Sequence, residues 1–332
     1  MGRGMDVISN FDLTDHNTFG LGSRAQYGAV VAGTEDIEAI VEFAASERLP
    51  LHVIGGGSNV LLRERIEGVV ALMAIKGRHV IGRQDGGVLV KAEAGEDWPD
   101  FVEWAVRQGF GGLENLAGIP GTVGAAPVQN IGAYGVELKD RFQCLTAYDC
   151  LERTVCSFGP EDCRFAYRHS AFKEVPGRYV ILDVTLVLPE PWQPILGYKG
   201  LDSLPADTDV LTVMERVLEL RRGKLPDWRV LGNAGSFFHN PIVAAEVAEG
   251  IAGGPRYPQA DGRVKLSAAW LIEACGLKGM RQGEAGVHEG HALILVNHGK
   301  ATYSDLDRLA STVQAAVKER FGVDLVREPI AV

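Results

Sequence analysis

Apolar residues recur every three or four positions in five stretches of the chain, the spacing that puts them on one face of an α-helix. Each stretch also has residues typical of helix ends, such as serine, threonine or aspartate at its start. These patterns predict helices that begin at Thr34, at Asp97, near Asp209, after Ser267 and at Ser304. The helix near Asp209 is expected to end before Gly223. Asp307 follows Ser304 by three residues, which is the spacing of a capping box.

Six short apolar runs predict β-strands, at residues 51–54, 69–75, 88–94, 143–148, 179–188 and 292–296. Residues 140–190 are mostly β in this interpretation. Helices and strands do not alternate regularly, so the pattern favours an α+β fold over a doubly wound sheet. Residues 192–200, which have prolines nearby, predict a long loop of a kind that is often functional in compact enzymes.

Composition narrows the classes of protein to consider. The 332 residues carry 33 basic and 43 acidic side chains, a net charge of −10, which disfavours nucleic acid as a partner. Apolar runs are too short for a membrane helix, and the N-terminus leads into polar sequence. We therefore expect a soluble, cytoplasmic protein that binds neither nucleic acid nor membranes.

Cysteine and glycine differ in what they indicate. The five cysteines have spacings that fit no zinc or redox motif, so we expect reduced, structural thiols.

Glycine is abundant, 41 residues of 332, and it gathers in three short segments. Because aliphatic residues are also plentiful, we attribute this to backbone conformation or close ligand approach and not to disorder.

The first glycine segment, Gly55-Gly56-Gly57-Ser58-Asn59, follows an apolar strand. It lacks the lysine of a P-loop and the third glycine of a dinucleotide fingerprint. Spacing alone leaves two interpretations open, a structural turn or a backbone cradle for a phosphate.

The other two segments are residues 118–135 and 232–241. The former has almost no side chain that could fill a core, so a large flat ligand against its backbone would explain how it is ordered. In the latter, Ser236 stands between small residues and two phenylalanines, and spacing alone favours a turn hydroxyl.

Together these segments carry a resemblance. The motifs at residues 17–20, 55–62, 112–124, 129–135, 165–170, 224–226, 232–238 and 257–262, in this order, resemble the family of UDP-N-acetylenolpyruvoylglucosamine reductases. These flavoenzymes complete the muramic acid unit of bacterial peptidoglycan. The loop bearing Tyr198 resembles the form of the family with a tyrosine on a mobile substrate loop.

The resemblance implies an α+β fold, with an FAD-binding two-domain module of the vanillyl-alcohol-oxidase (PCMH) type and a C-terminal α+β substrate-binding domain. It implies FAD-binding subdomains at residues 1–77 and 78–223 and a substrate-binding domain at 224–322. The tail, about residues 323–332, is expected to return to the first subdomain.

The resemblance also implies a reaction. NADPH is expected to reduce a non-covalent FAD, which then reduces UDP-N-acetylglucosamine enolpyruvate to UDP-N-acetylmuramate. Residues expected to bind FAD are Ile54, Gly55, Gly56, Gly57, Ser58, Asn59, Gly118, Ile119, Pro120, Gly121, Gly124, Ala125, Asn130, Gly132 and Tyr134. The expected partners are small molecules only, and we expect a monomer.

Three residues match the family's catalytic positions. Ser236 matches the proton donor, while Arg168 and Glu328 match the residues that hold and polarise the substrate carboxylate. From the residues alone, Arg168 would be interpreted as a surface ion pair. Pro329 stands where the family usually has a valine.

Four residues are expected to contact the UDP-sugar: Tyr198, Arg221, Lys224 and Asn240. His288 and His291 flank Glu289, but they lack a further ligand, and we expect no metal site. Two rival functions are an oxidase of the same FAD fold and a non-redox protein that binds nucleotide sugars.

Overall fold

The computed structural model describes residues 5–332, which pack into two compact units. The first unit holds described residues up to 11, residues 25–56 and residues 67–223, and the second holds residues 12–24, 57–66 and 224–332. The division into three domains that the resemblance implies stays a prediction.

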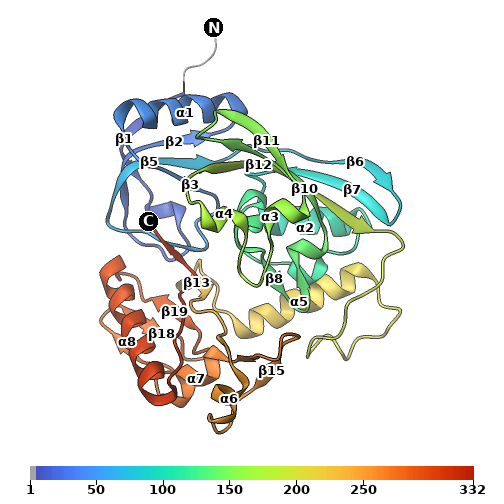
Figure 1. Ribbon diagram of the computed structural model, residues 1–332, viewed down its shortest axis with the longest axis vertical. Helices are drawn as coiled ribbons and strands as arrows, with labels where there is room; N and C mark the ends of the chain where they lie inside the picture. Colours follow the sequence, from blue (N-terminus) through green and yellow to red (C-terminus); the bar gives the residue numbers. More distant parts are fainter. Residues whose placement is uncertain (1–4) are drawn as a thin grey trace. The chain divides into compact units, whose positions relative to one another are not determined.

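The N-terminal part of the chain forms a four-stranded sheet. Its order is β1 (Ile8–Asp12), β2 (Arg24–Val31), β5 (Arg65–Met73) and β3 (Leu51–Ile54), with β3 parallel to β5. Helix α1 (Thr34–Glu47) lies along this sheet (Figure 1). It buries Ile37, Ile40 and Val41 in the same apolar core as Val69 and Ala71 of β5, as its apolar spacing predicts.

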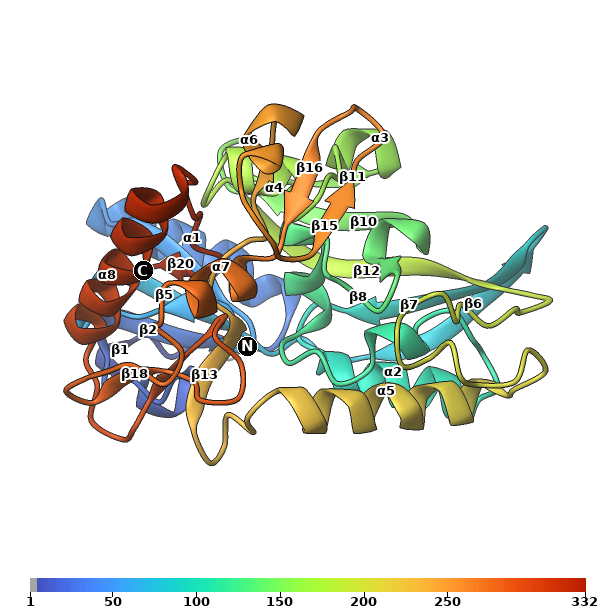
Figure 2. The same ribbon diagram turned by 90° about the horizontal axis from the view of Figure 1, so that it is seen from below.

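The largest sheet is antiparallel, in the order β11 (Thr154–Phe158), β10 (Phe142–Asp149), β12 (Tyr179–Pro189), β7 (Gly87–Glu93) and β6 (Arg78–Gln84). Strands β12, β7 and β6 run side by side in Figure 2. Helix α2 (Trp98–Arg107) begins where β7 ends. Its N-cap is Asp97, whose Oδ1 accepts the Asp100 amide at 3.1 Å, and Trp98 and Phe101 are fully buried.

Further elements, most of them short, complete the first unit and carry many of the candidate site residues. They are η2 (Glu114–Leu116), η3 (Val123–Gln129), β8 (Gly132–Ala133), β9 (Val136–Glu137), η4 (Leu138–Asp140), α3 (Pro160–Cys163), α4 (Ala171–Glu174) and α5 (Val210–Lys224). The loop between β12 and α5 includes the predicted loop at residues 192–200.

The second unit has two antiparallel sheets and three helices. One sheet has the order β13 (Gly232–Ser236), β19 (Ile294–Asn297), β18 (Ala285–Val287) and β17 (Arg281–Gln282), and the other has the order β14 (Ile242–Val243), β16 (Val264–Leu266) and β15 (Arg256–Pro258). The helices are α6 (Ala245–Glu249), α7 (Ala268–Ala274) and α8 (Tyr303–Phe321), with a 3₁₀ turn η1 (Thr14–His16). Strand β20 (Ile330–Ala331) pairs in parallel with β4 (Val60–Leu61).

The structure confirms the five predicted helices and the six predicted strands to within a few residues at their ends. It also confirms the α+β class, because most strand pairs are antiparallel and helices are segregated from them. Helix α5 continues through Gly223 to Lys224, so its predicted end was too early. The structure also has strands outside the six predicted runs, among them β1, β2, β6 and β13.

The predicted cap of the last helix was wrong. Helix α8 begins at Tyr303 with Thr302 as its N-cap, and Thr302 Oγ1 accepts the Asp305 amide while Asp305 accepts the Thr302 amide. Thr302 and Asp305 have the same spacing as Ser304 and Asp307, so the pattern alone could not distinguish the two boxes. Asp307 instead forms an ion pair with Arg327.

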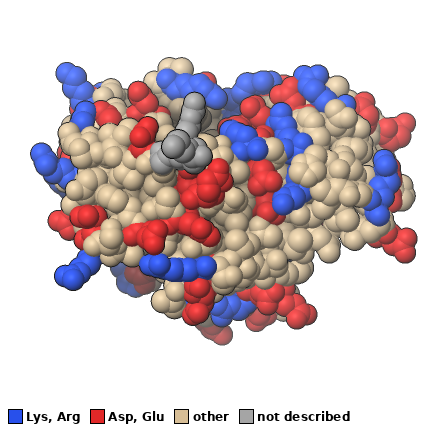
Figure 3. Space-filling view, turned by 90° about the horizontal axis from the view of Figure 1, so that it is seen from above, with Lys and Arg blue, Asp and Glu red and all other residues tan. Residues whose placement is uncertain are grey.

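The five cysteines are free thiols. Burial raises the pKa of Cys150 to about 11 and that of Cys163 to about 12, so these two thiols are protonated at neutral pH and unreactive. Within residues 5–332 no helix has the length and apolar character needed to cross a membrane. Basic and acidic side chains are interspersed on the face shown in Figure 3.

The corrected cap predicts different stability effects for two hydroxyl residues two positions apart. Thr302→Ala should lower the free energy of unfolding by about 0.5–2 kcal/mol, because the Asp305 amide loses its acceptor. Ser304→Ala should change it by less than about 0.5 kcal/mol, since Ser304 lies exposed within the helix. Urea unfolding followed by circular dichroism measures both. Equal losses in the two variants would contradict this assignment of the cap.

Candidate active site

The first two glycines of the 55–57 segment are required by close packing within the first unit. A Cβ on Gly56 would lie 2.8 Å from Cα of Gly121, and one on Gly55 would lie 3.4 Å from Cβ of Thr122 and closer still to its hydroxyl. Two of the glycine segments recognised in the sequence therefore run backbone against backbone. This establishes the structural interpretation of these glycines, while Gly56 itself remains exposed.

Main-chain hydrogen bonds fix the second glycine segment on the end of β7 and the start of α2. The amide of Val123 donates to Glu96 O and that of Gly124 donates to Ala94 O, both at 2.9 Å. Trp98 N donates to Gly121 O, also at 2.9 Å. A side chain on Gly124 would clash with Ala94, because its Cβ would lie 2.9 Å from Cα of that residue. The segment is ordered by protein backbone, with little side-chain bulk.

Asn130 organises the end of this segment. It is fully buried and adopts a left-handed conformation, with φ of 45°. Its Nδ2 donates to Glu137 Oε2 at 2.9 Å and to Ala166 O at 3.1 Å, and its Oδ1 accepts the Lys139 amide at 3.0 Å. Since the side-chain amide is used within the protein, Asn130 can serve a ligand only through its main chain or by shaping the segment.

Arg168 lies next to this segment, held by a tight turn. Ala166 and His169 exchange two backbone hydrogen bonds at 3.1 Å, and Arg168 between them has φ of 54°. Its Nη2 donates to Gly132 O at 3.1 Å. The turn and this bond direct the guanidinium to the backbone of residues 129–135.

Two buried polar residues that sequence reasoning did not single out connect Tyr134 with the loop of Tyr198. The Nδ2 of Asn115 donates to Tyr134 O at 2.8 Å and to Ile195 O at 3.0 Å. Glu114 accepts the indole N–H of Trp192 at 3.0 Å. Both residues lie in the 112–124 motif, but their side-chain roles depend on partners about 80 positions away in the sequence.

Tyr198 itself is 40% exposed, and its ring meets that of Tyr134 edge to face, with centroids 4.9 Å apart. Burial raises the pKa of the Tyr134 phenol. Its hydroxyl therefore stays protonated at neutral pH, able to donate a hydrogen bond.

Arg221 on α5 lies beside this pair and beside Gly118, where a Cβ would be 3.2 Å from its Nε. Burial lowers the pKa of the Arg221 guanidinium, and Tyr134 acts in the opposite direction. No carboxylate among the described residues acts on this pKa. A largely buried cation without a carboxylate beside it is a suitable partner for an anionic ligand.

In the second unit, Ser236 ends β13, opposite Ile294 of β19. The strand is irregular between Asn233 and Ser236, and Gly235 has φ of 69°. Asn233 is buried and supports this bulge, because its Oδ1 accepts the Gly235 amide at 2.9 Å and its Nδ2 donates to Leu231 O at 2.8 Å. The bulge holds the serine in a fixed position.

Residues 17–20 contact both the 55–57 loop and the strand that carries Ser236, which explains why the three motifs occur together. Thr18 N donates to Gly57 O at 3.1 Å, and Thr18 O accepts the Asn233 amide at 3.0 Å. A Cβ on Gly57 would lie 2.8 Å from Cα of Asn17, and one on Gly232 would lie 2.8 Å from the carbonyl carbon of Phe19. This segment therefore joins the third glycine of the 55–57 loop to the strand that carries Ser236.

The main chain of Glu328 lies next to Phe237, the residue that follows Ser236. Glu328 N donates to Phe237 O at 2.8 Å, and its carbonyl accepts Asn59 Nδ2 at 3.3 Å. The carboxylate is largely buried and lies 4.0 Å from His239 Nε2. Ile330 N donates to Asn59 O at 3.0 Å, so the N–H donors that anchor the tail lie on either side of Pro329, whose missing N–H is not needed.

Lys224 and Asn240, also in the second unit, have separate surroundings. Burial is the main cause that lowers the pKa of the His291 imidazole. The nearby side chains of His288, Lys224 and Lys278 lower this pKa further. Asn240 Oδ1 accepts the Ala268 amide at the start of α7 at 2.9 Å. No group of three metal-ligating side chains occurs in the described part of the chain, and the cations around His291 oppose a metal ion there.

The remaining expected FAD contacts lie along the same two segments. Ile54 is buried at the end of β3, Ser58 and Asn59 follow the glycines, Ile119 and Pro120 are half-buried, and Ala125 is exposed on η3. The first unit brings together Arg168, Tyr198, Arg221 and the 118–135 segment, and the second brings together Ser236 and Glu328. Their roles toward ligands stay predictions.

The chain was compared with known proteins. The C-terminal domain of UDP-N-acetylenolpyruvoylglucosamine reductase matches residues 227–332, and an FAD binding domain matches residues 25–154. The UDP-N-acetylenolpyruvoylglucosamine reductase of Pseudomonas aeruginosa is 47% identical, with 98% of each chain covered, and that of Bordetella pertussis is 48% identical, with 97% of this chain and 94% of the relative covered.

The crystal structure of UDP-N-acetylenolpyruvylglucosamine reductase (MurB) from Thermus caldophilus has the same fold, with a TM-score of 0.68 over 98% of both chains at 24% identity. The predicted architecture, an FAD-binding module followed by a C-terminal substrate-binding domain, is confirmed by these matches. With close relatives matched from end to end and both domain types present, the chain belongs to the UDP-N-acetylenolpyruvoylglucosamine reductase family of FAD-dependent oxidoreductases.

Proposed function

We propose that the protein uses NADPH to reduce UDP-N-acetylglucosamine enolpyruvate to UDP-N-acetylmuramate, a precursor of peptidoglycan. The observation that carries this proposal is that Ser236 stands on a strand bulge and that the next residue, Phe237, accepts the main-chain amide of Glu328, whose carboxylate is largely buried. A serine so placed is a candidate proton donor for carbon. The relatives named above supply the identity of the substrate.

The residues of the two glycine segments fit FAD. Gly56 can carry no side chain without displacing Gly121, and its exposed backbone is the part of the loop that would face a phosphate group. The FAD would be held, without a covalent bond, by residues 54–59 and by the 118–134 backbone. When bound, FAD supplies the hydride that the vinyl carbon of the substrate receives.

The chain's own residues would then handle the charge and the proton. Hydride addition leaves negative charge next to the substrate carboxylate, and Arg168 and Glu328 would hold and polarise that carboxylate. Ser236 would give its proton to the neighbouring carbon. A serine hydroxyl is a weak acid in water, so its contribution depends on a fixed position, which the Asn233-supported bulge provides.

The diphosphate end of the substrate requires cations and hydrogen-bond donors. Arg221, without a carboxylate acting on it, and Lys224 are suited to the phosphates, and Tyr198 and Asn240 would add neutral contacts. In this proposal the enzyme is a cytoplasmic monomer that acts on small molecules alone.

The phosphate interpretation of the 55–57 loop can be tested at Gly56. Gly56→Asp should lower FAD occupancy more than Gly56→Asn, because both side chains displace Gly121 but only aspartate repels a pyrophosphate. The ratio of flavin absorbance to protein, followed by FAD titration of the apoprotein, measures this difference. A Gly56→Asp variant that keeps full flavin occupancy would exclude the cradle.

Substrate contacts should be separable from NADPH contacts. Tyr198→Phe and Lys224→Ala should each raise KM for the UDP-sugar several-fold and leave flavin reduction by NADPH nearly unchanged, since both residues are assigned to the diphosphate end. Lys300→Ala, which removes an exposed lysine from the same unit as Lys224, is the control for a lost charge. Equal loss in the NADPH half-reaction would mean that the nicotinamide nucleotide uses these contacts too.

Ser236→Ala should separate the two half-reactions. Bleaching of the flavin by NADPH needs no proton from Ser236 and should persist, whereas reoxidation by the enolpyruvyl substrate should slow by about 10²- to 10⁴-fold. Substrate affinity should change little, because the hydroxyl acts in the transition state. Stopped-flow absorbance resolves the two phases, with Ser304→Ala as a matched serine control. Reoxidation at the parent rate would leave Ser236 as a turn residue only.

A further inference from the structure

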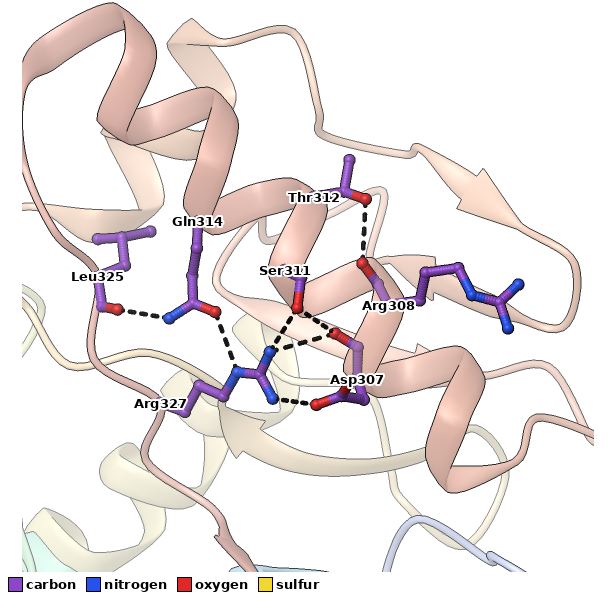
Figure 4. Close-up of polar contacts among 7 residues, drawn as sticks. All are labelled: Asp307, Arg308, Ser311, Thr312, Gln314, Leu325 and Arg327. Carbon is purple, nitrogen blue, oxygen red and sulfur yellow. Dashed lines mark hydrogen bonds and ion pairs between the residues drawn. The ribbon is translucent and has the colours of Figure 1, made fainter.

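Arg327, the residue before Glu328, ties the tail of the chain to helix α8 through several hydrogen bonds. Arg327 Nε donates to Gln314 Oε1 at 3.1 Å, its Nη2 donates to Ser311 Oγ at 2.9 Å and to Asp307 O at 3.2 Å, and its Nη1 pairs with the Asp307 carboxylate (Figure 4). The guanidinium thus uses all three of its nitrogens. The side chain of Arg327 is 26% exposed, so this network is partly shielded from water.

The three partners lie on one face of α8. Residues 307, 311 and 314 are spaced by four and three, which aligns them along the helix. Gln314 also donates from Nε2 to Leu325 O at 2.8 Å, so it holds the tail at two points (Figure 4). The tail is therefore fixed to a rigid helix over residues 325–327.

Apolar packing holds the tail at only some of its positions. Leu325 and Pro329 are buried, but Val326 is 59% exposed and Ile330 is 44% exposed. Pro329 contributes no N–H to the tail's backbone bonds. Between Leu325 and the pairing of β20 with β4, the Arg327 side chain is bonded to α8, and the Glu328 carbonyl accepts a bond from Asn59.

Arg327 and Glu328 are consecutive residues of an extended chain, so their side chains point to opposite sides. Arg327 pairs with Phe238 in an antiparallel bridge, and the Glu328 amide donates to Phe237 O, one residue after Ser236. A slip of Arg327 on α8 would move the Glu328 carboxylate relative to Ser236. Holding the Arg327 side chain on α8 therefore also holds Glu328 on the opposite side of the chain.

We propose that Arg327 is a positioning residue for Glu328, acting through Asp307, Ser311 and Gln314. This inference rests on the proposed role of Glu328 in holding the substrate carboxylate. Arg327 touches no reacting atom in this proposal. It sets the register at which the buried carboxylate meets the strand of Ser236.

The test compares Arg327→Met with Arg308→Met. Arg308 is a matched control because it is an arginine on α8 next to Asp307, the ion-pair partner of Arg327. Its own side chain is 72% exposed, and its ion pair with Asp305 is long, at 3.9 Å. In Arg327→Met, reoxidation of reduced flavin by the enolpyruvyl substrate should slow about tenfold to a hundredfold, the cost of a small misplacement, while bleaching by NADPH stays within twofold of the parent. Arg308→Met should match the parent in both phases.

A second readout does not depend on turnover. Hydrogen exchange followed by mass spectrometry should show faster exchange of the Glu328 and Ile330 amides in Arg327→Met than in Arg308→Met, with the Phe237 region less affected. Arg327→Lys keeps the charge and one donor, so it should restore part of the reoxidation rate. If Arg327→Met does not fold, Arg327→Lys is compared with Arg308→Met in its place.

The outcomes separate the two proposals. If the parent enzyme is bleached by NADPH but not reoxidised by the enolpyruvyl substrate, the proposed function is wrong and the positioning role falls with it. If the parent turns over and Arg327→Met reoxidises and exchanges like Arg308→Met, the proposed function stands and the positioning role of Arg327 is overturned.

Discussion

Close approach of bare backbone is the constraint on which the candidate site depends. In the second unit, the main chain of Thr18 is bonded on one side to Gly57 and on the other to Asn233, with Gly57 and Gly232 each too close to neighbouring backbone to carry a side chain. The loop assigned to FAD and the strand assigned to proton donation are thus held by one segment. Any side chain at these glycines would force the two apart.

In the first unit, the buried side-chain amide of Asn130 orders the glycine-rich segment. Asn130 has no exposed surface, and its three hydrogen bonds join the glycine-rich segment to β9, to η4 and to the turn that presents Arg168. A segment with so few side chains has no core of its own and gains its rigidity from such bonds. Buried polar groups that are fully paired specify one conformation, which is what a binding surface made of backbone requires.

The sequence predicted those features that depend on local pattern. Helix α1 follows its apolar spacing, and the motifs of residues 55–62, 118–135 and 232–238 mark the segments that carry the candidate site. The cap of α8 was misplaced because two boxes of the same spacing overlap. Thr302 and Asp305 form the capping bonds, whereas Asp307 pairs with Arg327. Strand β6 was missed because its exposed residues do not alternate clearly with buried ones. Asn115 and Glu114 could not be identified as loop anchors, because nothing near them in sequence reveals contacts with Trp192 and Ile195.

In the proposed function, the anchoring of the Tyr198 loop limits how much chain has to be ordered around the substrate. Its incoming end is pinned by the bonds of Trp192 to Glu114 and of Ile195 to Asn115. Its outgoing end is pinned where Gly200 O accepts Arg216 Nε at 3.0 Å and where Leu201 is fully buried. Residues 196–199 lie between these anchors, and Tyr198 O accepts the Leu201 amide at 2.9 Å. At about 1–2 kcal/mol of backbone entropy per residue fixed, a segment this short can be ordered by a few contacts to phosphate, whereas a freely hinged loop of the same reach would require many more.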